Sequence, residues 1–137
     1  MRGEIKYLER YKQLISYAGM ELTRKITPTD IDGFIDLKGK CFIYIEGKLI
    51  NKELDYGQRL ALENVVKSHE KADHKSIAII FRHNSKPDEL IDAKSQIVSE
   101  VYLKYNNNYK WRKPPKVNLL TCLLNYIKWI EKIGIDI

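Results

Sequence analysis

Two acids and a lysine are spaced so that their side chains could form a metal-binding or catalytic site. Asp32 lies in the run Ile31–Leu37, and Glu46 and Lys48 lie in the run Cys41–Leu49. Both runs read as strands, and the Lys-Gly-Lys between them indicates a hairpin. Side chains alternate along a strand, so Glu46 and Lys48 are expected on the same face.

The register of this hairpin decides whether the acids meet. If the residues that flank the loop pair with each other, Asp32 lies directly opposite Glu46. The same register matches Ile35 with Ile43 on the apolar face, whereas a slip of one residue would send the two sets to opposite faces. Burial therefore favours the arrangement that brings the carboxylates together.

Two facing carboxylates, about 5 Å apart at their Cβ atoms, repel unless a proton or a divalent cation lies between them. Mg²⁺ prefers oxygen ligands and can activate water. Lys48 would then orient the attacking water or stabilise charge that builds up on a phosphate. The same spacing also fits an exposed ion pair between Glu46 and Lys48 on a solvated strand. Spacing alone leaves both interpretations open.

The elements that must position the hairpin follow from periodicity and breakers. We expect helices over residues 4–20, 55–72 and 117–133, and strands over 76–82 and 96–104. The last helix is expected to bury one stripe, made of Leu120, Leu123, Leu124, Ile127 and Ile130. Three asparagines at 106–108 read as a turn or loop. This order predicts one α/β (α+β) domain over residues 1–137 with a mixed sheet.

The hairpin and the helix after it resemble the PD-(D/E)XK nuclease motif. Asp32 is the acid of one strand, and the apolar strand Cys41–Lys48 ends in Glu-x-Lys, with the two acids 14 positions apart. The following helix opens with Tyr56-Gly57-Gln58-Arg59, and many members of the family carry a Gln there. Together with His83-Asn84, the string is similar to short phage-encoded members.

The resemblance implies a restriction-endonuclease-like fold, a mixed central sheet flanked by helices. It also implies Mg²⁺- or Mn²⁺-dependent hydrolysis of phosphodiester bonds by an endo- or exonuclease. Asp32 and Glu46 would be the metal ligands, with the Gly47 carbonyl as a further ligand. Lys48 would be the catalytic lysine and Gln58 an accessory catalytic residue.

Three points qualify this picture. Many relatives use a Glu from the first helix, for which Glu9 is the candidate, with Glu4 behind it. Gln58 also completes a capping-box pattern with Asp55, and the two roles can coexist. The middle residue of Glu-x-Lys is usually bulky and apolar, whereas Gly47 has no side chain, which would loosen the site or admit a close backbone approach.

The net charge lies outside the hairpin. The formal charge is +6, and residues 101–130 hold no acid but six cations, so this segment accounts for all of it. Aromatic residues interleave with the cations there, as a surface that neutralises phosphates and stacks on bases requires. The expected contacts to nucleic acid are Lys104, Lys110, Trp111, Arg112, Lys113 and Lys116. The alternative is a basic loop whose aromatics belong to the core.

Composition narrows the classes of partner and of cellular compartment that the protein could have. The longest apolar runs span five residues, too few to cross a bilayer, so no membrane partner is expected. Cys41 and Cys122 are far apart and outside any CxxC pair, which favours a reducing cytoplasm. We expect a nuclease that acts on nucleic acid, with DNA as the first candidate, and a homodimer is one arrangement that fits.

Two other functions stay open. The first is a nuclease-like fold with a weak or inactive site, which acts as a nucleic-acid-binding or inhibitory protein. The second is an interaction protein without nucleic-acid function, whose basic segment contacts an acidic protein. Nucleic-acid binding that does not fall with salt, or no such binding at all, would support it.

Overall fold

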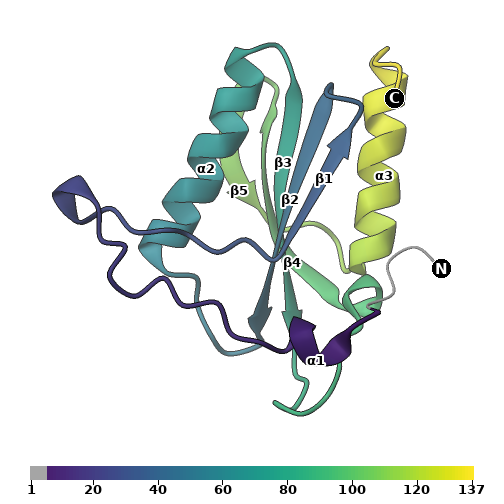
Figure 1. Ribbon diagram of the computed structural model, residues 1–137. Coiled ribbons are helices and arrows are strands. Elements are labelled where there is room, and N and C mark those ends of the chain that lie inside the picture. The colour runs from purple at the N-terminus through teal and green to yellow at the C-terminus, as the bar shows by residue number, and fades with distance from the viewer. Residues whose placement is uncertain (1–5) are drawn as a thin grey trace.

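The protein folds around one mixed sheet, seen here in a computed structural model that describes residues 6–137 (Figure 1). Its five strands lie side by side in chain order: β1 (Gly33–Leu37), β2 (Cys41–Leu49), β3 (Lys75–His83), β4 (Ile97–Tyr105) and β5 (Asn108–Arg112). Strands β2 and β3 are parallel, and the other neighbouring pairs are antiparallel. The expected α+β fold class with a mixed sheet is confirmed.

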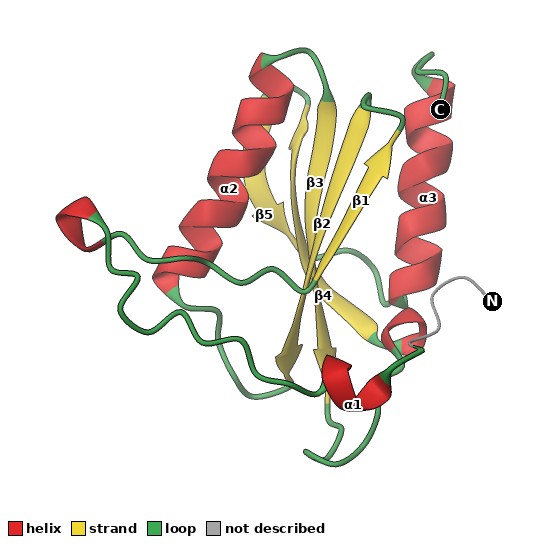
Figure 2. Ribbon diagram, in the orientation of Figure 1, coloured by secondary structure: helices red, strands yellow, loops and turns green. Residues whose placement is uncertain are grey.

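Helices cover both faces of this sheet (Figure 2). Helix α2 (Tyr56–Lys71) connects the parallel strands, as a crossover between parallel neighbours requires. Its buried residues Leu62 and Val66 pack with Ala78 and Ile80 of β3. Helix α3 (Leu119–Lys132) covers the opposite face, where the core holds Cys41, Ile43, Ile77, Ile79, Phe81, Val98, Val101, Leu119, Tyr126 and Ile130.

Burial on both faces explains the central strand. Residues 76–81 of β3 are all buried, which confirms the reading of this apolar run as a strand covered on two sides. The strand predicted over 96–104 corresponds to β4. Helix α2 corresponds to the helix predicted over 55–72.

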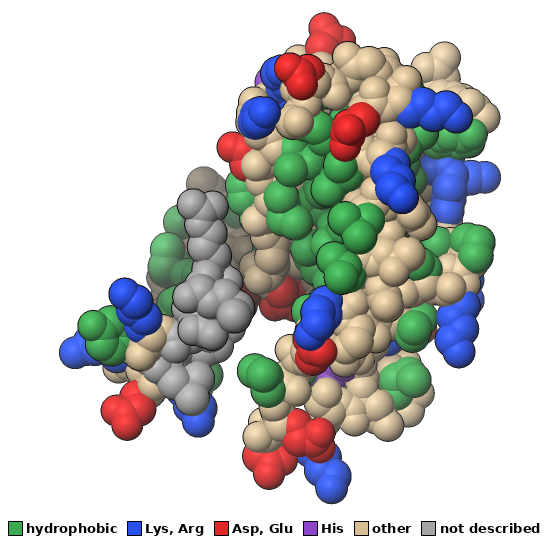
Figure 3. Space-filling view, turned by 90° about the vertical axis from the view of Figure 1, so that its right-hand side faces the viewer, with side chains coloured by type: hydrophobic (Ala, Val, Ile, Leu, Met, Phe, Trp, Pro, Cys, Tyr) green, Lys and Arg blue, Asp and Glu red, His purple; other side chains and the backbone are tan. Residues whose placement is uncertain are grey.

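The buried stripe of α3 differs from the predicted one. Leu119, Tyr126 and Ile130 are buried, whereas Leu120 and Leu124 are 44% and 49% exposed. Exposed apolar side chains are therefore visible on the α3 side of the molecule (Figure 3). The prediction counted aliphatic residues only, but Tyr126 occupies the core and its hydroxyl lies 3.6 Å from the Cys41 sulfur. The tyrosine rotates the buried stripe by about one residue.

The helix predicted over 4–20 is wrong within the described residues. Helix α1 spans only Leu8–Tyr11, and a 3₁₀ turn covers Thr23–Lys25. Leu14 is 97% exposed and Ile15 is 77% exposed. Apolar residues at helical spacing stabilise a helix only when a core surface receives them, and here none does.

Strand β5 was not predicted. Asn106 and Asn107 form the turn with positive φ angles of 50° and 60°, conformations that asparagine tolerates. Asn108, predicted as loop, begins β5, which pairs with β4. The basic and aromatic segment is thus partly an edge strand.

Two findings concern the chain's environment. Within residues 6–137 no helix is long and apolar enough to span a membrane. Both cysteines are free, Cys41 buried and Cys122 half-buried, and burial raises the pKa of each thiol.

Candidate functional site

The hairpin brings Asp32 and Glu46 together as predicted. Gly33 pairs with Ile45 and Leu37 with Cys41, which is the register that the apolar face favoured. Asp32 stands just before β1, and its backbone N–H donates to Glu46 Oε2 at 3.4 Å. In return, the Gly47 N–H donates to Asp32 Oδ2 at 2.8 Å. Each acid is therefore held by the backbone next to the other.

Glu46 is a buried acid. Only 5% of the residue is exposed, on the face of β2 where Tyr44 packs in the α2 cluster. Burial, and then the charge of Asp32, raise the pKa of Glu46 to about 7, although the Lys48 ammonium acts in the opposite direction. The exposed ion pair weighed as the alternative does not describe this buried carboxyl.

Lys48 lies on the same face, one pleat beyond Glu46. It is half-buried and pairs in register with Arg82 of β3. Both stand near the carboxyl ends of the two parallel strands, the edge at which open α/β sheets bind ligands. Arg82 is anchored there, because its Nη1 donates to the carbonyls of Leu49 and Lys52.

The glycine of Glu-x-Lys has a packing reason. Gly47 pairs with Phe81, and a Cβ added to Gly47 would lie 2.4 Å from Phe81 Cζ. The ring occupies the space on the α3 face that a bulky residue at position 47 would need. The departure from the usual motif is compensated locally, and the backbone between Glu46 and Lys48 keeps its strand geometry.

Gln58 stands in the first turn of α2. Its Oε1 atom is buried and has no hydrogen-bond partner among the described residues. The capping box expected with Asp55 is wrong, because Asp55 is the N-cap residue but its side chain accepts no capping hydrogen bond. A buried amide oxygen without a partner marks a position where a ligand or water would be accepted.

The acid expected from the first helix does not join the site. Glu9 lies in α1, is exposed, and is not among the groups that shift the pKa of Glu46. Glu4 lies outside the described residues.

The donor set suits a hard cation. Among the described residues, hydrogen bonds occupy Oδ2 of Asp32 and Oε2 of Glu46, which leaves one oxygen of each carboxylate. No group of three or more His, Cys, Asp or Glu side chains that could hold a metal ion occurs within residues 6–137. Asp32 and Glu46 are two carboxylates, fewer than such a group, but carboxylate oxygens are ligands that Mg²⁺ and Mn²⁺ prefer.

Two of the predicted nucleic-acid contacts are engaged inside the protein. The Trp111 Nε1–H donates to Glu63 Oε2 at 3.2 Å, and the Arg59 guanidinium lies 4.6 Å from the Trp111 ring centroid. Arg112 donates to four backbone carbonyls, including that of Leu103 at 2.9 Å. The alternative of aromatics belonging to the core describes Trp111 and the buried Tyr102.

The remaining predicted contacts are lysines at or near the β5 edge. Lys110, Lys113 and Lys116 are exposed, and Lys104 is half-buried with its ammonium 5.8 Å from the Tyr109 ring centroid. Lys104 belongs to β4 and Lys110 to β5, whereas Lys113 and Lys116 follow β5 in the chain.

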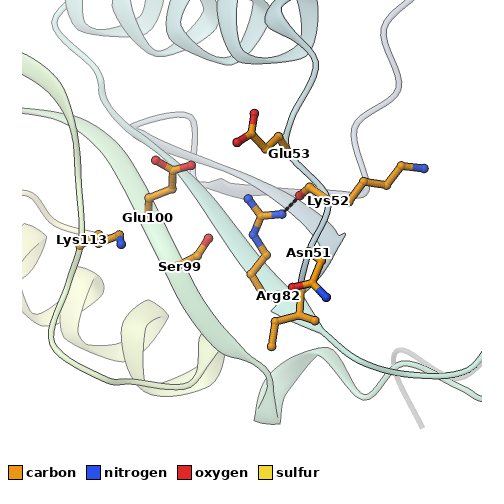
Figure 4. Close-up of a pocket in the computed structure, with 8 residues that line it drawn as sticks. Asn51, Lys52, Glu53, Arg82, Ser99, Glu100 and Lys113 are labelled. Carbon is orange, nitrogen blue, oxygen red and sulfur yellow. Dashed lines mark hydrogen bonds between the residues drawn. The ribbon is translucent and has the colours of Figure 1, made fainter.

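A pocket of about 390 Å³ lies beside the candidate site, and sequence reasoning missed it (Figure 4). It is lined by Ile50, Asn51, Lys52, Glu53, Arg82, Ser99, Glu100 and Lys113. Glu100 pairs with Arg59 at 2.7 Å. Ser99 is the extra residue of a β-bulge opposite Ile80 and Phe81. Bulges often occur next to active sites, but no sequence pattern predicted this one.

Comparison of the chain with family models, with curated proteins and with solved structures gives no significant match. The resemblance to PD-(D/E)XK nucleases thus depends on the motif residues themselves.

Proposed function

We propose that this protein is a metal-dependent nuclease of the PD-(D/E)XK type that hydrolyses phosphodiester bonds of nucleic acid, with DNA as the first candidate substrate. One observation carries the proposal. Asp32, just before β1, and Glu46 of β2 are brought together by two hydrogen bonds, from the Asp32 N–H to Glu46 and from the Gly47 N–H to Asp32, and Lys48 lies one pleat beyond Glu46 on the same face of β2.

The electrostatics of the acid pair support a bound cation. Burial and the neighbouring Asp32 make an ionised Glu46 costly, as its raised pKa shows. A divalent cation beside the two carboxylates would remove that cost and favour both charged forms. Mg²⁺ or Mn²⁺, held by Asp32, Glu46 and the Gly47 carbonyl, would supply Lewis-acid polarisation of the phosphate.

Lys48 supplies the positive charge of the protein itself. Its ammonium would donate to a phosphate oxygen on which negative charge develops, or orient the attacking water. Gln58 would accept a hydrogen bond from that water or from the substrate through its free Oε1. Arg82, which pairs with Lys48 and is anchored to the Leu49 carbonyl, would contact a flanking phosphate.

The test is the loss of cleavage in Lys48→Ala. Removal of one preorganised stabilising group typically lowers kcat by about 10²- to 10³-fold. We expect that loss on labelled single-stranded, duplex and branched DNA and RNA in Mg²⁺ or Mn²⁺, with no cleavage by the parent in EDTA. Lys132→Ala, an exposed lysine in the last turn of α3, is the matched control and should cut like the parent.

Equal cleavage by Lys48→Ala and the parent would overturn the proposal. Tight binding without Mg²⁺ and without cleavage of any substrate would instead indicate the nucleic-acid-binding or inhibitory protein. Gly47 favoured that reading in the sequence, but its packing against Phe81 explains the glycine without an inactive site.

We also place this activity in a reducing cytoplasm, which the two free cysteines support. Nucleic acid is the proposed partner, and a homodimer would suit cleavage of both strands of a duplex.

A further inference from the structure

A row of flat rings runs across the α2 face of the sheet. The rings of Phe42 and His69 stack at 4.0 Å between centroids with planes 12° apart. His74 lies on Phe42 at 5.8 Å and 9°. Phe34 continues the row from β1, at 6.2 Å and 10° from Phe42. All these rings are therefore nearly parallel.

The row ends at Phe34 without a cover. β1 is an edge strand of the sheet, so no further strand follows it. Phe34 is 55% exposed although it is a large apolar side chain. It is also held in place, because the Tyr44 ring packs against it at 5.1 Å, and Tyr44 itself bonds His69 Nε2 at 2.8 Å. The outermost ring is thus both oriented and accessible.

This open ring is next to the acid pair. Phe34 pairs with Tyr44, and Glu46 is two positions from Tyr44 on β2, so the side chains of Phe34 and Glu46 share one face of the sheet. Diagonal neighbours of this kind lie about 7–8 Å apart. Asp32 is hydrogen-bonded to Glu46. A phosphodiester held at Asp32 and Glu46 would therefore carry a nucleoside within reach of the Phe34 ring.

We propose that Phe34 is a stacking platform for an unpaired nucleobase beside the scissile phosphate, so the substrate is single-stranded or locally unpaired nucleic acid. This inference rests on the proposed function. Every base has a flat π-face, and stacking on an aromatic side chain contributes without a sequence preference. A base inside a duplex is covered on both sides and reaches such a ring only at an end, in a bulge or after flipping.

The experiment measures binding in the Lys48→Ala background, in which substrate is not consumed. Affinity for a fluorescent single-stranded oligonucleotide and for a blunt duplex of the same length is followed by anisotropy in Mg²⁺. Stacking energies of about 1–3 kcal/mol predict that Phe34→Ala weakens single-strand binding by about 5- to 150-fold. Duplex binding should change little. Phe34→Trp should restore the affinity, and its added fluorescence should be quenched by the single strand.

Leu124→Ala is the matched control. Leu124 is 49% exposed on α3, the helix on the opposite face of the sheet, and its loss should leave both affinities unchanged. The stacking role is overturned if Phe34→Ala leaves the single-strand affinity of the Lys48→Ala protein unchanged. It is also overturned if Phe34→Ala weakens single-strand and duplex binding equally. If the otherwise unmodified Phe34→Ala protein still cuts single strands as fast as the parent, only this inference fails. If the parent cuts nothing, the proposed function itself fails.

Discussion

The β1–β2 hairpin and the β4–β5 hairpin both carry charged side chains and aromatic rings, yet they differ in how their charged groups are paired. In β4–β5, Arg59 pairs with Glu100 and covers Trp111, and Trp111 donates to Glu63. Arg112 likewise donates to four backbone carbonyls, whereas Lys110 stays exposed. In β1–β2, Glu46 is buried next to a second acid and its pKa is raised.

This difference indicates which of the two hairpins is the better candidate for a functional site. A closed network of hydrogen bonds and ion pairs stabilises a fold and has little left for a ligand. A buried carboxyl whose ionisation is costly marks a position that a cation or a proton would complete. Trp111 and Arg112 of the basic segment are therefore structural, whereas Glu46 of the nearly neutral hairpin is the group that a bound cation would stabilise.

The largest effect is expected from the pH dependence of stability. The folded state raises the pKa of Glu46 from 4.5 to about 7, so it binds this proton more tightly than the unfolded state does. The free energy of unfolding contributed by Glu46 is thus fully present below about pH 4.5, falls between 4.5 and 7, and stays low above 7. The fall amounts to roughly 3 kcal/mol.

Urea unfolding of the metal-free protein from pH 4 to 8 measures this fall, and Glu46→Gln, which cannot ionise, should lack it. Above pH 7, Mg²⁺ should stabilise the parent by binding the folded state, and should have no such effect on Glu46→Gln. If the free energy of unfolding of the parent and of Glu46→Gln changed with pH in parallel, ionisation of Glu46 would not be costly in the folded state. The contrast between the two hairpins would then be lost.

A smaller loss is expected from Gly47→Ala. The new Cβ would lie 2.4 Å from the Phe81 ring, and overpacking of this kind costs about 1–3 kcal/mol. Chemical denaturation measures the loss, and Phe81→Leu in the same chain should recover part of it. Gly57→Ala, where an added Cβ meets no atom within 4 Å, is the control. An alanine tolerated at 47 without Phe81→Leu would show that the ring does not constrain the site.

The smallest expected effects on stability and on DNA binding distinguish the roles of Lys110 and Trp111, which are neighbours in β5. Lys110→Gln should leave the unfolding free energy within about 0.5 kcal/mol of the parent. It should also lower the slope of log affinity for duplex DNA against log salt by about 0.9. Trp111→Phe should do the reverse, because it removes the bond to Glu63 and lowers stability by about 1 kcal/mol. Titrations at several salt concentrations and thermal melts decide between them, and a Trp111→Phe protein with weakened binding but unchanged stability would restore the nucleic-acid role of Trp111.

The hairpin could be predicted because its signals agree. A three-residue loop and alternating apolar residues specify one register, and that register places Asp32 opposite Glu46 without tertiary information. The prediction of β3 also held, because its short apolar run suits a strand covered on both faces.

The rest depended on contacts that no local pattern contains. Ile15 belongs to a set of apolar residues at helical spacing, but no core surface receives it. Tyr126 shifts the buried stripe of α3 by reaching Cys41 across the core. The β-bulge at Ser99, and with it the pocket of Arg82 and Lys113, arises from β3–β4 pairing. The three asparagines at 106–108 indicated a turn or loop, and only the pairing with β4 shows that the last of them begins β5.

The contact between Gly47 and Phe81 also means that the residue type at one position restricts the residue type that evolution can accept at the other. Phe81 belongs to the core on the α3 side, while Gly47 stands between the two candidate catalytic side chains. Neither residue can change size alone without a clash or a void. Relatives with a bulky residue at position 47 should therefore carry a smaller one at position 81, and a library built to reshape the site should vary the two together.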